Sequence, residues 1–172
     1  MNKSLNYAWV GLGSNQGDSL NILRQACIDL STIIAQDLQQ SPIYLTQPWG
    51  YTDQPIFFNQ VVTFNTHFTA MELLKILFKI EEKHARQRTL LWGPRTLDLD
   101  LLDYQDVICQ ENSLILPHPR LHLRRFVLQP WCDLAPLHYL KSYQASIQEL
   151  LQCCPDTSQI TQLPSSSYGS ED

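Results

Sequence analysis

The chain contains 172 residues, 44% of them hydrophobic and 17% charged, which is enough to bury a core and excludes an intrinsically disordered protein. The formal net charge of −5 argues against a general nucleic-acid-binding protein. No apolar run is long enough to cross a bilayer and no signal peptide is visible, so we expect a cytoplasmic protein without a membrane segment.

The N-terminal part of the chain predicts two strands, one helix and a long loop. Residues 7–12 (YAWVGL) are typical of a buried strand, and residues 13–18 predict a tight loop whose glycines let the backbone turn sharply. These glycines fit neither the dinucleotide fingerprint nor a P-loop. Apolar residues at helical spacing predict a helix that starts near residue 19. A second strand is expected at 41–45, and residues 46–55 (TQPWGYTDQP) predict a loop of a kind that is often functional.

The second half of the chain repeats the alternation of strand and helix. A third strand is predicted at 57–66, and a capping box from Thr69 to Glu72 opens a second helix. A fourth strand is expected to end at Tyr104, and it is followed by a hairpin at 106–116, short helical turns at 121–135 and a last helix at 146–153. The order β-α-β-β-α-β is that of the ferredoxin-like arrangement. We therefore expect an α+β fold with a mostly antiparallel sheet, helices on one face, and C-terminal additions.

The stretch 92–102 (WGPRTLDLDLL) carries the strongest chemical signal. Asp98 and Asp100 alternate with leucines, so the two carboxylates share one face of a strand while the leucines enter a core. Two carboxylates with phosphate oxygens are a typical Mg²⁺ site, and Arg95 on the preceding turn suits a phosphate group. Seven of the twelve Lys and Arg residues fall in two windows without acids, 83–95 and 120–125, which indicates a local site for a small anion.

A second group of residues is suited to a flat heterocycle. Phe57 and Asn59 share one face of the third strand, and Asn59 either satisfies a backbone group or recognises the edge of a ligand. Phe126 and the aromatic loop could stack on such a ring.

Four blocks of the sequence, GLGSN, DQPIFFN, WGPRTLDLDLL and PHPRLHLRRFVLQP, resemble the 6-hydroxymethyl-7,8-dihydropterin pyrophosphokinase family over about residues 5–140. The resemblance implies transfer of the β,γ-pyrophosphate of ATP to the pterin hydroxymethyl group, with release of AMP, in folate biosynthesis. It implies ATP as co-substrate and two Mg²⁺ ions. We expect a monomer that acts on these small molecules, with one pyrophosphokinase domain at 1–163 and a polar, disordered tail at 164–172.

The resemblance also implies roles for individual residues at the matching positions. The expected catalytic residues are Arg86, Arg95, Asp98 and Asp100, of which Asp98 and Asp100 would ligate the metal. The expected ATP contacts are Glu81, Arg88, Trp92, Arg95, Leu101, His118 and Arg124. The expected pterin contacts are Thr46, Gln47, Trp49, Phe57, Asn59, Trp92 and Phe126, with Phe57 and Phe126 on the two ring faces and Asn59 at the polar edge.

The sequence departs from the family pattern at several positions. Leu91 stands where arginine or lysine is usual, and Ala85, Leu90 and Phe78 also differ from the common residues. One alternative is therefore a paralogue that keeps the fold and binds nucleotide or pterin but turns over poorly. A second alternative is a ferredoxin-like RNA-binding module with stacking aromatic side chains, which the acidic balance disfavours.

Overall fold

The computed structural model describes residues 5–33, 36–48, 53–84 and 96–164. The main sheet comprises strands β1 (Asn6–Ser14), β2 (Gln36–Gln40), β3 (Tyr44–Thr46), β4 (Phe57–Thr66), β5 (Asp98–Tyr104) and β10 (Ile160–Gln162). The helices are α1 (Ser19–Ile33), α2 (Ala70–Lys83), α3 (Arg125–Leu134), α4 (Ile147–Gln152) and the 3₁₀ helix η1 (Leu121–Leu123). Two small hairpins complete these elements, β6 (Cys109–Glu111) with β7 (Leu114–Leu116), and β8 (Tyr139–Leu140) with β9 (Ala145–Ser146).

The strand order confirms the predicted ferredoxin-like core. The strands lie in the order β10-β3-β4-β1-β5, with β2 also paired to β4, and each of these pairs is antiparallel. β1 is therefore flanked by β4 and β5, although β4 lies far along the chain. Two strands of the main sheet, β2 and β10, were not predicted. Both are short and polar, so backbone pairing with a neighbouring strand defines them rather than an alternating apolar pattern.

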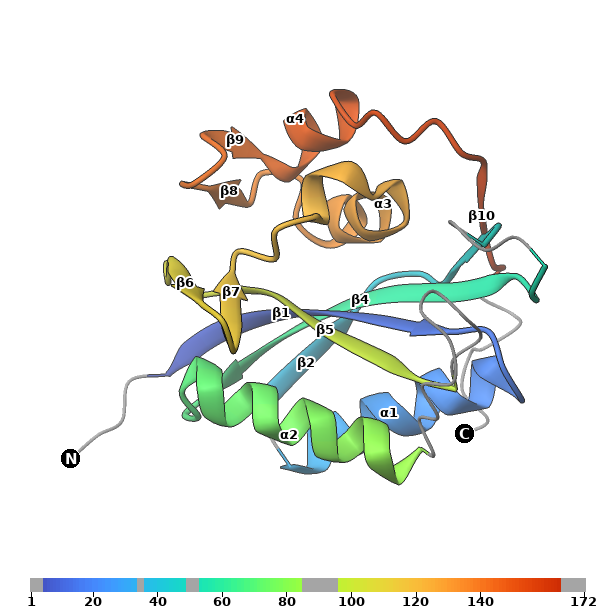
Figure 1. Cartoon of the computed structure of the whole chain (residues 1–172), viewed down its shortest axis with the longest axis horizontal. Helices are drawn as coiled ribbons and strands as arrows, with labels where there is room; N and C mark the ends of the chain where they lie inside the picture. Colours follow the sequence, from blue (N-terminus) through green and yellow to red (C-terminus); the bar gives the residue numbers. More distant parts are fainter. Residues whose placement is uncertain (1–4, 34–35, 49–52, 85–95, 165–172) are drawn as a thin grey trace.

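Helices α1 and α2 cover one face of the sheet (Figure 1). Thr69 caps α2 and forms the predicted capping box with Glu72, and Leu73 and Leu77 of this helix are fully buried against the sheet. Leu23, Cys27 and Leu30 form the buried stripe of α1, as their spacing predicts. None of the helices in the described ranges is long and apolar enough to cross a membrane.

The C-terminal additions cover the opposite face of the sheet (Figure 1). A second core forms there, in which Trp9, Val61 and Leu102 from three strands pack against α3, α4 and the β8–β9 hairpin. The indole rings of Trp9 and Trp131 lie with centroids 5.1 Å apart. The fold therefore has three layers. The sequence predicted C-terminal additions, but not that they form a layer on the opposite face of the sheet.

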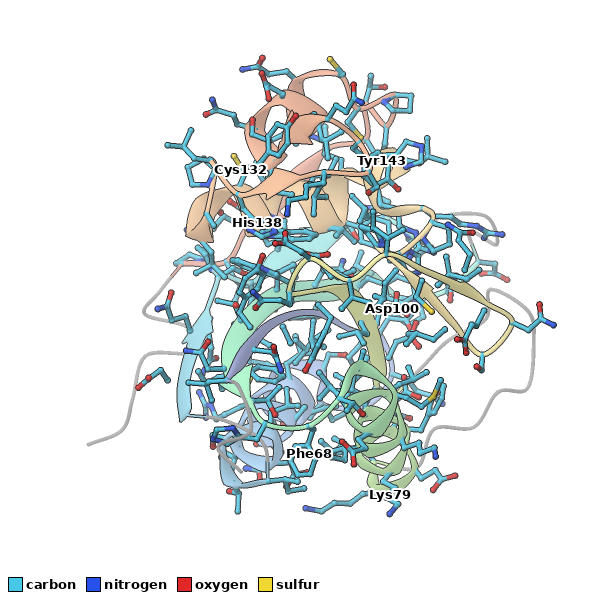
Figure 2. All side chains as sticks on the ribbon, turned by 90° about the vertical axis from the view of Figure 1, so that its left-hand side faces the viewer. Phe68, Lys79, Asp100, Cys132, His138 and Tyr143 are labelled. Atoms are coloured by element: carbon cyan, nitrogen blue, oxygen red, sulfur yellow. The ribbon has the colours of Figure 1, made fainter. Side chains whose placement is uncertain are left out.

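A buried hydrogen bond between His138 and Asp103 connects this third layer to the sheet. His138 Nε2 lies 3.0 Å from Asp103 Oδ2 on β5, and both side chains are almost fully enclosed. The register of β5 against β1 shifts between Trp9 and Val10, which turns Asp103 toward the third layer beside Leu102. Figure 2 shows His138 on the same side of the sheet as Asp100, with Phe68 and Lys79 on the side of α2.

Candidate active site

A cavity lies between the sheet and the start of α3. Strands β1, β3, β4 and β5 form its floor and walls, and the first turn of α3 closes one side. The lining residues are Gly11, Leu12, Gly13, Thr46, Gln47, Phe57, Asn59, Gln60, Val61, Asp98, Asp100, Arg124, Phe126 and Val127. The predicted metal pair and the predicted pterin residues within the described ranges therefore meet in one cavity, although up to about 80 residues separate them in sequence.

The carboxylates of Asp98 and Asp100 lie on the cavity side of β5, as the alternating pattern predicts. Leu97, Leu99 and Leu101 point the other way and are buried in the core beneath α2. The Asp100 side chain keeps 38% of its surface exposed. It can therefore reach a ligand in the cavity without leaving its position on the strand.

Arg124 connects the carboxylate pair with the aromatic part of the cavity. Its Nη1 lies 3.3 Å from Asp100 Oδ2, and its guanidinium carbon lies 5.7 Å from the centre of the Phe126 ring. Arg124 is the residue before α3, in an extended conformation that directs the chain from η1 into the helix. The Arg124 side chain is only 16% exposed, and its guanidinium lies between a carboxylate and a ring face, so it is well placed to meet a phosphate group.

Asn59 and Thr46 form a buried polar pair at the opposite wall. Asn59 Nδ2 donates to Thr46 Oγ1 over 2.8 Å, and each residue is only 6% exposed. The pair couples β4 to β3, and it fixes the amide in one orientation. The sequence left two roles open for Asn59, a hydrogen bond to a backbone group or recognition of a ligand edge. The observed partner of the Asn59 amide is the Thr46 side chain and not a backbone group, and the amide borders the cavity.

Gly13 corrects one expectation. It lies within β1 rather than in the loop predicted at 13–18, whereas Gly11 lies in the predicted strand, and of the described glycines Gly17 alone has a positive φ, of 76°. Only this last glycine serves the turn that precedes α1. Gly11 and Gly13 line the cavity, together with Gln60, Val61 and Val127. No local pattern could have assigned these residues to the site, because their place depends on the register of three strands.

His118 lies near the carboxylates but is not among the cavity-lining residues. Burial lowers the pKa of its imidazole, and the negative charge of Asp100 opposes this effect. Its backbone N–H donates to Leu102 O over 2.8 Å, and its Nδ1 accepts from the Arg120 backbone N–H over 3.2 Å. The ring is therefore held within the electrostatic field of the site, and its ATP contact stays a prediction.

Two further predicted ATP contacts have buried side chains. Leu101 packs in the core under α2, on the far side of β5 from Asp100, so contact with a ligand in the cavity could come only from its backbone. Glu81 is 2% exposed, and its Oε1 accepts from the Leu99 backbone N–H over 2.7 Å. Because Leu99 lies between the two aspartates on an edge strand, Glu81 anchors the segment that carries them.

The structure predicts the cost of losing this anchor. Glu81→Ala leaves a buried N–H of β5 unsatisfied and should lower the free energy of unfolding by about 1–3 kcal/mol. Glu81→Gln keeps an acceptor oxygen and should lose less. Urea denaturation of both variants measures the difference, and equal stability of Glu81→Ala and the unmodified chain would contradict the anchoring role.

Five of the predicted site residues lie outside the described ranges. They are Trp49, Arg86, Arg88, Trp92 and Arg95. The departures Ala85, Leu90 and Leu91 lie there as well. Their roles stay predictions.

The carboxylate pair is compatible with Mg²⁺. The described residues contain no group of three or more His, Cys, Asp or Glu side chains that could hold a metal ion by themselves. Mg²⁺ does not need one, since it is usually bound through one or two carboxylates and completes its coordination with water and substrate phosphates. Hard oxygen donors at Asp98 and Asp100, both facing the cavity, fit that preference.

Comparisons with known proteins identify the family to which the chain is similar. Residues 9–136 match the family of 7,8-dihydro-6-hydroxymethylpterin-pyrophosphokinase (HPPK). The chain is 42% identical over 130 residues to the 2-amino-4-hydroxy-6-hydroxymethyldihydropteridine pyrophosphokinase of Bacillus subtilis, which covers 75% of this chain and 78% of the relative. It is 38% identical over 149 residues to the Pseudomonas aeruginosa protein of the same name, covering 86% of this chain and 91% of the relative.

Longer relatives contain the same unit as one part of a larger chain. The Schizosaccharomyces pombe folic acid synthesis protein fol1 is 38% identical over 130 residues, which cover 75% of this chain but 18% of that protein. The crystal structure of wild-type Plasmodium falciparum HPPK-DHPS with SDX-DHP superposes with a TM-score of 0.66 at 14% identity, covering 87% of this chain and 44% of that one. This chain spans less than half of the solved chain, and at that identity the likeness concerns the fold.

The family match covers most of the chain and contains both halves of the cavity, from the glycines of β1 to the first turn of α3. On these grounds, this chain belongs to the 7,8-dihydro-6-hydroxymethylpterin-pyrophosphokinase family.

Proposed function

We propose that the protein transfers the β,γ-pyrophosphate of ATP to the hydroxymethyl group of 6-hydroxymethyl-7,8-dihydropterin and releases AMP, as a step of folate biosynthesis. The observation that carries the proposal is the single cavity in which an aromatic and amide wall faces a carboxylate pair with an arginine. A reaction between a flat heterocycle and a nucleoside triphosphate requires that the groups binding the heterocycle and the groups binding the phosphates lie close together, so that the two substrates can touch.

The part of the cavity lined by Asn59 and the two phenylalanines would bind the pterin. Phe57 and Phe126 would stack on the two faces of the ring, and the fixed amide of Asn59 would recognise its polar edge. An amide that is already oriented by Thr46 loses little conformational freedom on binding. Thr46 and Gln47 would complete this part of the site, and both line the cavity.

The β5 side would bind the phosphates of ATP. Asp98 and Asp100 would hold Mg²⁺, and we propose two ions. The metal would supply positive charge that neutralises the charge developing on the transferred group. Arg124 would contribute a guanidinium to the phosphates, and its present contact with Asp100 keeps it within reach of them.

The arrangement favours direct transfer over a covalent enzyme intermediate. Of the cavity-lining groups that could act as a nucleophile, Thr46 is engaged with Asn59, and the carboxylates of Asp98 and Asp100 would hold Mg²⁺. The pterin hydroxyl itself would attack the β-phosphorus in line with the departing AMP oxygen, and it would lose its proton as the new P–O bond forms. Positioning of the two substrates and stabilisation of charge would therefore supply most of the rate enhancement.

The proposed chemistry also indicates the partners of the protein and its cellular compartment. ATP and a small heterocycle would be the partners of the protein, and we propose that it works as a monomer in the cytoplasm. The free thiols of all five cysteines fit a reducing compartment.

An AMP-release assay tests the proposal. Incubation with ATP, Mg²⁺ and reduced hydroxymethylpterin should yield AMP in a pterin-dependent manner, with the pterin diphosphate formed in equal amount. ATP binding without pterin-dependent AMP would contradict the proposal and favour a paralogue that binds without turnover. Release of ADP would instead indicate transfer of a single phosphoryl group.

A further inference from the structure

The middle of the cavity floor has no side chains. β1 runs between β4 and β5, and its register places Gly13 directly between Asn59 and Asp98. Two residues earlier, Gly11 lies between Val61 and Asp100. Since directly paired residues project from the same face of a sheet, two rows cross the floor, each with a glycine at its centre. All six residues line the cavity.

The backbone conformation does not explain these glycines. Neither has a φ in the left-handed region that favours glycine, and both lie in a regular antiparallel strand. Glycine in the interior of a strand is usually unfavourable, because it lacks a side chain to pack. The reason for glycine must therefore lie in the space above the strand.

Close packing of the protein does not explain them either. A Cβ atom built on Gly13 would have one neighbour within 4 Å, the Asn59 Oδ1 atom at 3.4 Å. The three atoms nearest to a Cβ on Gly11 all belong to the Leu102 side chain, at 3.5 Å or more. These nearest atoms belong to side chains and lie at 3.4 Å or more, so a methyl group would fit against the described part of the protein and would project into the cavity.

Strand β1 carries a large side chain, Trp9, on the same face as the two glycines. Trp9 precedes Gly11 by two residues, faces the same side of β1 and packs on Trp131 of α3. The third layer therefore rests on an aromatic side chain at one end of β1, and the cavity opens where the side chains stop.

We propose that Gly13, with Gly11 beside it, is a specificity-determining residue, because the absence of a side chain there leaves the path along which the pterin and its hydroxymethyl arm reach from Asn59 to the Asp98 side. The inference rests on the proposed function. Neighbouring strands are about 4.8 Å apart, so the Asn59 and Asp98 backbones are separated by about 10 Å across Gly13. A bicyclic ring with a one-carbon arm spans this distance, and any bridging molecule must pass over Gly13.

Gly13→Ala tests the inference by direct binding. We expect the dissociation constant of the reduced hydroxymethylpterin, measured by isothermal titration calorimetry with a non-hydrolysable ATP analogue and Mg²⁺ present, to rise about tenfold or more, because the methyl group overfills the site. The affinity for the ATP analogue alone should change less than about twofold, and the melting temperature should stay the same or rise. Gly11→Ala should act in the same direction.

Ser14→Ala is the matched control. Its side chain lies next in β1 and bonds to Ser19 Oγ over 2.9 Å, away from the cavity, so its pterin affinity should be unchanged. Unchanged pterin affinity of Gly13→Ala would overturn the inference and leave the proposed function intact. A loss of affinity accompanied by a lower melting temperature would assign Gly13 a packing role and overturn it as well. Failure of the unmodified protein to bind the pterin would overturn both the inference and the proposed function.

Discussion

Replacement of Asp98 or Asp100 by asparagine should lower the kcat of pterin-dependent AMP release by about a thousandfold or more. The amide keeps the shape of the side chain and removes the negative charge that would hold Mg²⁺ against the phosphates. Both side chains face the cavity from one edge strand, so no neighbouring residue of that strand can take over their position. Initial rates over a range of Mg²⁺ concentrations measure the effect.

Asp106→Asn provides the matched control for the loss of a carboxylate. Asp106 follows the end of β5 and forms an exposed ion pair with Lys141 Nζ at 2.8 Å. Exposed pairs contribute little to stability, and Asp106 does not line the active-site cavity, so this variant should keep the rate of the unmodified protein. If Asp98→Asn and Asp106→Asn lost the same small fraction of activity, the carboxylate pair would have no role in phosphate transfer.

The second large effect is expected at the heterocycle wall. Asn59→Leu should weaken pterin binding by about a hundredfold or more, since a site built to hydrogen-bond a polar edge discriminates strongly when that contact is lost. Binding of the ATP analogue with Mg²⁺ should change little, because Asn59 lies across β1 from the carboxylates. Calorimetric titration with each ligand separates the two affinities.

Asn65→Leu is the corresponding control on the same strand. Asn65 lies six residues further along β4, on the same face, paired with Tyr7 and outside the cavity. Equal pterin affinities of the two variants would show that Asn59 does not recognise the ring. The Asn59 variant also breaks the bond to Thr46, so its melting temperature is needed to separate lost recognition from lost stability.

The predictions for Asp98 and Gly13 concern the same row of paired residues, Asn59, Gly13 and Asp98, but test charge in one case and empty space in the other. Asp98 and Asn59 contribute chemistry at the two ends of one row, and Gly13 contributes empty space between them. Charge removal at Asp98 should therefore lower turnover, whereas added volume at Gly13 should weaken binding of the acceptor. A variant series across this row distinguishes a site that positions two substrates from one that only binds a nucleotide.

Local sequence patterns determined the main elements and half of the site's chemistry. The period of two in β5 placed Asp98 and Asp100 on one face and the leucines on the other, and the capping box at Thr69 marked the start of α2. These features depend only on residues a few positions apart. The sequence therefore specified them without knowledge of the fold.

Only the tertiary structure determined how the Asn59 side and the Asp98–Asp100 side of the cavity are connected and what lies between them. The contact of Arg124 with Asp100, the buried bond between Asn59 and Thr46, and the glycine rows of β1 all depend on strand order and register, which are set by packing between distant segments. For the same reason Gly13, which the local sequence placed in a loop, forms the open floor of the cavity together with Gly11. Side-chain chemistry can be read from a short stretch, whereas the space around it exists only after the chain has folded.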